Sequence, residues 1–154
     1  AARNNPQASK LEGLLTPMLL NDDKVMNGGD IYMRGNESAE DYLETILILS
    51  KKLPVVRSVD IAAEMGYSKP SVSVAMKNLR EKGHIEISHA GFITLTPSGS
   101  EIALRIYERH TFLSKWLMSL GIPEKTAIDD ACRMEHQMSE ESFAAMKRFI
   151  EAHQ

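Results

Sequence analysis

The chain of 154 residues is poor in several features, and each shortage excludes a class of protein. Its single cysteine, Cys132, cannot form a disulfide within the chain, so a disulfide-stapled fold is excluded and a reduced thiol is predicted. No apolar run approaches the roughly 18 residues of a membrane-spanning helix, and no charged-then-apolar leader opens the sequence. We therefore expect a cytoplasmic protein that does not bind membranes.

No sign of charge dominates either, because 18 Lys and Arg residues oppose 21 Asp and Glu residues. The net charge of −3 argues against indiscriminate binding to nucleic acid. The distribution of charge is more informative than its sum. Residues 67–82 carry four basic residues and one acid, whereas residues 129–141 carry five acids and one arginine. The first segment therefore suits phosphate groups and the second suits cations.

Turn-forming residues are concentrated at the start of the chain. Residues 1–35 contain Asn-Asn-Pro, Thr-Pro, Asn-Asp-Asp and Asn-Gly-Gly. This density predicts an N-terminal tail rather than a domain, and part of it could derive from cloning. Regular apolar spacing starts after it. We expect a winged helix-turn-helix domain over residues 36–98 and an all-helical domain over residues 99–154.

Capping residues and apolar spacing predict three helices and a hairpin in the first domain. Ser38-Ala-Glu-Asp41 has the form of a capping box, Ser58 is a second candidate N-cap, and Ser68 followed by Pro70 opens a third helix. Two alternating stretches within residues 84–96, separated by a short turn, predict a β-hairpin. The predicted fold is mainly α: a winged helix-turn-helix, with three helices and a β-hairpin wing, followed by an all-helical domain.

The third helix of this domain has the composition of a helix that reads DNA. Small polar and basic side chains at its N-terminal end allow close approach to bases in the major groove, and the start of the preceding helix can hold phosphate. The predicted DNA-binding residues are Arg57, Ser58, Ser68, Lys69, Pro70, Ser71, Ser73 and Lys77. The alternatives are that Ser68 only caps the helix, that the lysines only solvate it, or that the winged helix binds proteins instead.

The second domain carries a thiol, a carboxylate and an imidazole at helical spacing. Glu135 and His136 follow Cys132 by three and four residues, which places the three side chains on one helix face, within reach of one ion. Three further candidate ligands lie upstream: Asp41, Glu44 and His110. Carboxylate oxygens, imidazole nitrogens and a thiolate together suit a first-row divalent cation. A metal site assembled from segments that flank a DNA reader predicts a metal-sensing transcription factor.

Each candidate ligand also has an ordinary structural interpretation. Asp41 could be only the capping residue of its helix, and Glu44 a solvated surface charge. Cys132 could be a small buried hydrophobe, and the acid and imidazole that follow it could be exposed on the helix. His110 could be a core histidine with satisfied hydrogen bonds. The argument for a metal depends on the grouping, because carboxylates gathered together cost electrostatic energy that a bound cation offsets.

Five segments, in this order, resemble the diphtheria-toxin-repressor and manganese-transport-regulator family of metal-dependent repressors. They are Glu40-Asp-Tyr-Leu-Glu44, Ser68-Lys-Pro-Ser-Val-Ser73, Leu95-Thr-Pro-Ser-Gly99, Arg109-His110 and Ala131-Cys-Arg-Met-Glu-His-Gln-Met-Ser139. The resemblance implies a homodimer with an N-terminal winged helix that binds double-stranded operator DNA. It also implies a C-terminal helical domain for metal binding and dimerisation, in the short form that has no SH3-like third domain.

The implied ligand set combines two branches of this family. Asp41 and Glu44 match the acidic pair of the manganese-type members. Cys132 instead matches the toxin-repressor type, at a position where manganese-type members carry a glutamate. The other three ligands match both branches. The second metal site of the toxin-repressor type needs further groups at positions that are occupied here by Ser114 and Ile128.

The metal that this ligand set implies is Mn2+ or Fe2+, with Co2+ or Zn2+ as surrogates, because oxygen ligands favour Mn2+ and a thiolate favours softer ions. The sequence therefore predicts a metal-dependent transcriptional regulator rather than an enzyme. We expect a repressor of metal-uptake genes that its corepressor ion activates, with a role in metal homeostasis. The alternatives are a winged-helix regulator not controlled by metal and a small metalloenzyme that uses Glu135 as a general base.

Overall fold

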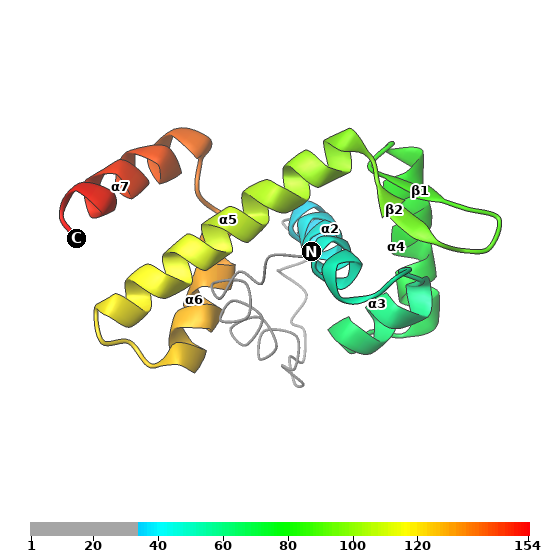
Figure 1. Cartoon of the computed structure of the whole chain (residues 1–154), viewed down its shortest axis with the longest axis horizontal. Coiled ribbons are helices and arrows are strands. Elements are labelled where there is room, and N and C mark those ends of the chain that lie inside the picture. Colours follow the sequence, from blue (N-terminus) through cyan, green and yellow to red (C-terminus); the bar gives the residue numbers. More distant parts are fainter. Residues whose placement is uncertain (1–33) are drawn as a thin grey trace, which may run out of the picture. The chain divides into compact units, whose positions relative to one another are not determined.

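The computed structural model describes residues 34–154, so the predicted tail over residues 1–35 lies almost entirely outside the described residues. Figure 1 labels the elements in chain order, from α2 to α7 with strands β1 and β2 between α4 and α5. The described residues form two compact units, residues 34–106 and residues 107–154. Helix α5, Pro97–Ser119, runs from the first unit into the second.

Helix α2, Arg34–Lys52, begins before the predicted capping box. Ser38 therefore lies inside the helix, and the prediction that the helix starts there is wrong. The glycine at position 35 costs only about 1 kcal/mol in a helix, so a sequence that resembles a cap does not prevent an earlier start. Helix α2 ends at Lys52, before Pro54, because a proline disfavours helical backbone in the residue that precedes it.

Helices α3, Ser58–Met65, and α4, Lys69–Glu81, form the helix-turn-helix. The N-cap of α3 is Arg57 rather than Ser58, and the Asp60 carboxylate accepts the Arg57 N–H at 2.8 Å. The predicted cap at Ser58 is thus wrong by one residue. The prediction for α4 is confirmed, because the Ser68 side chain accepts the Ser71 N–H at 3.4 Å.

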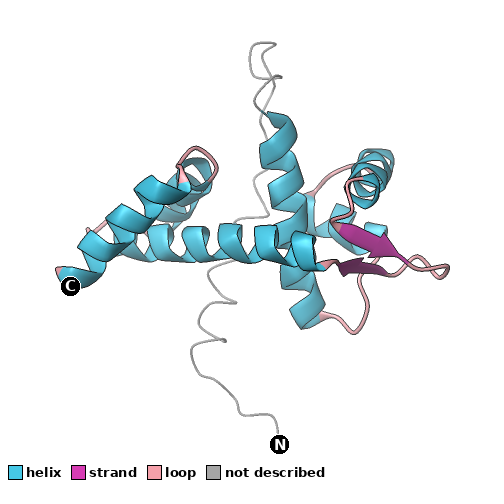
Figure 2. Cartoon of the chain, turned by 90° about the horizontal axis from the view of Figure 1, so that it is seen from above, coloured by secondary structure: helices cyan, strands magenta, loops and turns pink. Residues whose placement is uncertain are grey.

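Strands β1, Ile85–Ile87, and β2, Ile93–Leu95, pair in antiparallel register with Ile85 opposite Leu95. They are the magenta arrows of Figure 2. Ile85 and Ile93 are buried, whereas the middle residue of each strand is exposed, as expected for a hairpin with one face on the core. Gly91 makes the turn with φ 83°, a backbone conformation that favours glycine.

The core of the first unit joins all of its elements, and its largest fully buried side chains come from α2, α3, α4 and β1. They are Leu43, Ile46, Ile61, Val72, Met76 and Ile85. Burying such a side chain contributes about 1.5–3 kcal/mol. These contacts hold α4 rigidly on α2 and leave its opposite face exposed. The predicted winged helix-turn-helix, followed by helices, is confirmed.

The segment Thr96–Gly99 fixes the start of α5 against the turn that precedes β1. The Thr96 and Ser98 hydroxyls both donate to the Gly83 carbonyl oxygen, at 2.7 and 3.1 Å. The backbone passes so close that a Cβ atom on Gly99 would lie 1.9 Å from the His84 carbonyl oxygen. Only glycine fits without a shift of the backbone. The helix starts at Pro97, because proline is tolerated in the first helical turn.

The second unit contains most of α5 and the helices α6, Glu124–Glu135, and α7, Glu140–Ala152. Leu113, Ala131 and Phe143, one from each helix, form its buried centre. The N-cap of α7 is Ser139, whose side chain accepts the Ser142 N–H at 3.1 Å. Helix α6 ends at Glu135, with His136 as its C-cap.

Among the residues that the structure describes, none of the helices is long and apolar enough to cross a membrane.

Gly99→Ala tests the close approach at the start of α5. An ordinary Gly-to-Ala change inside a helix stabilises it by roughly 0.5–1 kcal/mol. Here we expect the opposite sign, a loss of about 1–3 kcal/mol or more in the free energy of unfolding, because the new methyl group meets backbone. Urea denaturation measures this, with Ser100→Ala, expected within about 0.5 kcal/mol of wild type, as the control. A Gly99→Ala protein as stable as wild type would contradict this account.

Candidate metal centre and DNA-binding face

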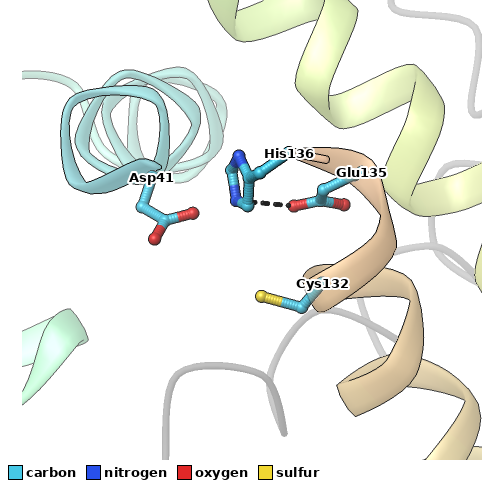
Figure 3. A group of neighbouring side chains, drawn as sticks. All are labelled: Asp41, Cys132, Glu135 and His136. Carbon is cyan, nitrogen blue, oxygen red and sulfur yellow. Dashed lines mark ion pairs between the residues drawn. The ribbon is translucent and has the colours of Figure 1, made fainter. Parts of the chain in front are cut away.

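Three of the predicted ligands come together at the C-terminal end of α6 (Figure 3). Cys132 and Glu135 lie in its last turn, and His136 is its C-cap. One thiol sulfur, one carboxylate oxygen and one imidazole nitrogen lie within 4.8 Å of one another. Donors bound to one first-row ion at about 2.0–2.3 Å are separated by at most about 4.6 Å. The spacing of the three donors is therefore close to the limit for ligands of a single ion.

Glu135 is the most buried member of this group, with 0% of its surface exposed. Its Oε2 lies 3.0 Å from Nδ1 of His110, and its Oε1 lies 3.4 Å from Nε2 of His136. Burying a carboxylate costs several kcal/mol unless nearby groups compensate. An imidazole nitrogen at each oxygen supplies part of that compensation, and a bound cation would supply more. The interpretation of Glu135 and His136 as exposed helix residues is wrong, since the His136 side chain is only 5% exposed.

His110 reaches Glu135 from α5, where it is 2% exposed. One turn later the buried Ser114 hydroxyl donates to the His110 carbonyl oxygen at 2.8 Å, so this hydroxyl is engaged with its own helix. Ile128 on α6 is 1% exposed and has no donor atom. Neither position supplies a further ligand. The candidate ligands of the helical unit are His110, Cys132, Glu135 and His136.

The exposed side of α6 carries charges that pair with each other. Arg133 donates to Asp130, and this hydrogen bond, followed by the charge of the same carboxylate, raises the pKa of Arg133. The positive charge of Arg133, which follows Cys132 in the sequence, is thus neutralised locally by Asp130. A cation near the thiol would meet less repulsion from this arginine than the sequence alone suggests.

Asp41 and Glu44 belong to α2, in the other unit. Because α2 begins at Arg34, Asp41 lies in the helix interior, and its interpretation as a capping residue is wrong. Asp41 is half-buried and is also labelled in Figure 3. Glu44 is 3% exposed, so its interpretation as a solvated surface charge is wrong as well.

Helix α4 and the start of α3 present the predicted DNA-binding side chains to solvent. Of the eight predicted residues, seven are exposed and Ser58 is half-buried. Ser68 and Ser71 bind each other through their hydroxyls at 2.8 Å at the N-terminal end of the helix. The guanidinium carbon of Arg57 lies 4.8 Å from the centre of the Phe92 ring in the wing, which holds the start of α3 and the hairpin together.

Two residues with exceptional surroundings were given no role in the sequence analysis. Val74 is 61% exposed on the face of α4 opposite the buried Val72 and Met76, where its methyl groups could meet those of thymine. Arg109 is 6% exposed although it carries a charge. The sequence indicated this residue only through its position next to His110, inside a helix with apolar neighbours. A lone arginine in a sequence gives no indication of which carbonyl groups it will reach.

Comparison with known proteins adds independent information on both units. Residues 36–91 match the family model described as the N-terminal DNA binding domain of iron dependent repressors. Residues 96–154 match the model described as the metal binding and dimerisation domain of iron dependent repressors. The transcriptional regulator MntR of Escherichia coli O6:H1 is 36% identical over 117 residues, which cover 76% of this chain and 76% of the relative.

Two solved structures have the same fold. The manganese regulator SloR is 26% identical with a TM-score of 0.66, over 73% of this chain and 53% of that one. A manganese-dependent transcriptional repressor in complex with manganese is 29% identical with a TM-score of 0.65, over 73% and 52% of the two chains. This chain thus spans about half the length of these two structures.

These matches confirm the resemblance drawn from the five sequence segments, and the family is one of DNA-binding regulators rather than enzymes. The chain belongs to the iron-dependent repressor family of metal-dependent transcriptional regulators.

Proposed function

We propose that this protein is a transcriptional repressor of metal-uptake genes, activated by Mn2+ or Fe2+ as corepressor. The observation that carries the proposal is the fully buried Glu135 carboxylate, which has an imidazole nitrogen near each oxygen and a thiol beside it. Oxygen, nitrogen and sulfur donors of this kind fit a divalent transition metal. When bound, such an ion supplies a positive charge that several ligands can share.

The proposed ligands are contributed by both domains: Asp41, Glu44, His110, Cys132, Glu135 and His136. Asp41 is included because it lies inside the helix rather than at a cap, and Glu44 is included because its carboxylate is buried. Carboxylates are suitable ligands for Mn2+ and Fe2+, and sharing a cation offsets the cost of placing them near one another. We propose domain limits of 36–98 for DNA binding and 99–154 for metal binding and dimerisation.

Ligands from α2 and from α6 that share one ion would hold the DNA-binding domain in a fixed orientation to the dimerisation domain. In a homodimer, two copies of α4 must enter successive major grooves about 34 Å apart. The orientation of each DNA-binding domain would therefore set the affinity for the operator. The ion favours this arrangement only to the extent that the arrangement binds it more tightly than others do.

Within the DNA-binding domain, α2 and α4 are connected by direct packing. The ring of Tyr42, the residue after Asp41, meets the ring of Tyr67 edge-on at 6.0 Å between centroids. Tyr67 immediately precedes Ser68, the N-cap of α4. Burial and, to a lesser degree, Tyr67 raise the pKa of Tyr42, so its phenol stays neutral at physiological pH. A change in the position of α2 would therefore be passed directly to the helix that reads DNA.

The DNA-binding face in this proposal is the exposed face of α4 together with the start of α3. Lys69 and Lys77 supply charge for phosphate groups, and the serines are small enough to let the helix backbone approach base edges. The Lys77–Glu81 pair at 3.9 Å is highly exposed and contributes little to stability. Lys77 therefore remains available to exchange this partner for a phosphate group.

DNA binding by the full chain under controlled metal supply tests the proposal. Duplexes would be selected from a random pool with and without Mn2+, and binding then measured anaerobically with Mn2+, Fe2+, Co2+, Zn2+ or a chelator. We expect Mn2+ or Fe2+ to tighten binding by about tenfold or more, equivalent to roughly 1.4 kcal/mol. Lys77→Glu should weaken DNA binding in every condition while leaving metal binding intact. DNA affinity that a chelator leaves unchanged would instead favour a regulator not controlled by metal.

Cys132→Glu tests the role of the thiol in metal preference. Replacing sulfur by a carboxylate removes the softest donor, so the ratio of activating concentrations, Co2+ over Mn2+, should rise by about tenfold. Cys132→Ser is the control, because it removes the thiolate without adding a carboxylate and should weaken activation by both ions. The measurement is the concentration of each ion that gives half-maximal DNA binding. Identical selectivity in Cys132→Glu and wild type would show that the thiol is not a ligand.

A further inference from the structure

We infer that Arg109 is a positioning residue for the metal centre, which orients Glu135 and His136 without being a ligand itself. The inference rests on the proposed metal-binding function and adds a residue that the ligand set does not contain. Its evidence is a set of contacts within residues 107–154.

The guanidinium of Arg109 binds the chain on both sides of His136. Its Nη1 donates to the Glu135 carbonyl oxygen at 2.9 Å and to the Met138 carbonyl oxygen at 2.6 Å. Only the residues from His136 to Ser139 connect α6 to α7, and these two carbonyl groups enclose the first part of that connection. One nitrogen atom therefore fixes the backbone that carries an imidazole ligand.

The end of α6 needs such a partner. The last carbonyl groups of a helix have no hydrogen-bond donor within the helix, and burial makes an unsatisfied carbonyl costly. A positive charge near a helix C-terminus is also favoured by the helix dipole. From the neighbouring helix α5, Arg109 supplies both a donor for the terminal carbonyl group and a positive charge at the end of α6. The end of α6 is thereby held in place, and with it the turn that carries Cys132 and Glu135.

Two consecutive residues of α5 hold the same glutamate. Arg109 binds the backbone of Glu135, and His110 Nδ1 lies 3.0 Å from its carboxylate oxygen Oε2. Fixing both the backbone and one oxygen restricts the direction in which the second oxygen points. A ligand whose direction is set in advance loses less freedom when an ion binds, which strengthens binding.

A fixed positive charge near a cation site would weaken binding unless it were neutralised. Nη2 of Arg109 forms an ion pair with Oε2 of Glu140 at 2.7 Å, in the first turn of α7. The guanidinium carbon also lies 5.1 Å from the centre of the Phe143 ring. Arginine suits this place better than lysine, because its planar fork can bind two carbonyl groups and a carboxylate at once.

The test is titration of the full chain with Co2+, anaerobically, followed by its absorption spectrum. Thiolate and imidazole ligands give charge-transfer and d–d bands whose position and intensity report the geometry around the ion. We expect Arg109→Met to weaken Co2+ binding by about 10–100-fold and to change the d–d bands at saturation. Arg109→Lys, which keeps the charge but not the fork, should recover part of the affinity.

Two control variants separate positioning from charge and from general stability. Glu140→Gln keeps both carbonyl contacts of Arg109 but removes the carboxylate that neutralises its charge, so Co2+ binding should weaken less than in Arg109→Met and the d–d bands at saturation should not change. Arg105→Met removes an exposed ion pair with Glu40 from the same helix and should change neither the Co2+ affinity nor the spectrum. Circular dichroism establishes that each variant is folded at the titration temperature. If Arg109→Met does not fold, Arg109→Lys carries the comparison.

The outcomes distinguish this inference from the proposed function. A wild-type protein without thiolate-to-Co2+ absorption would contradict the proposed metal site and the inference with it. A wild-type protein that binds Co2+, with a folded Arg109 variant of the same affinity and the same spectrum, would overturn the positioning role alone.

Discussion

The arrangement of the helical domain depends on the burial of the Glu135 carboxylate. A fully buried negative charge must be compensated, and α5 and the end of α6 each direct an imidazole nitrogen at one of its oxygens. A hydrophobic residue at the same place would cost less, since the exchange of buried charges for apolar groups is often neutral or stabilising. A domain that keeps this arrangement despite its cost is best understood as one that binds a cation.

The fold brings these groups together by ordinary packing. Leu113, Ala131 and Phe143 form a small core that fixes three helices around the site. In the DNA-binding domain, a separate core holds α2 and α4 as one body, and the Tyr42–Tyr67 contact joins them next to Asp41 and Ser68. Each domain thus has its own core and carries candidate donor groups on a helix. In the proposed function, an ion bound by donors of both domains would join them.

Much of this could be predicted from the sequence, and the failures have a common physical cause. Apolar spacing and capping residues predicted the helices and the hairpin of the first domain, and the cap at Ser68 was predicted correctly because its hydrogen bond spans only three residues. The start of α2 and the function of Gly99 depend on contacts that sequence spacing does not reveal. Arg109 is the clearest example, since its partners lie 26 to 31 residues further along the chain.

The most direct test of the account is thermodynamic reciprocity between metal and DNA. The Mn2+ affinity of the full chain would be measured by calorimetry, alone and with a saturating amount of a selected duplex. If one ion joins the two domains in the DNA-binding arrangement, the duplex must tighten Mn2+ binding by the same factor by which Mn2+ tightens DNA binding. Equal Mn2+ affinities with and without DNA would show that the ion does not control the reading helices, and would contradict the account.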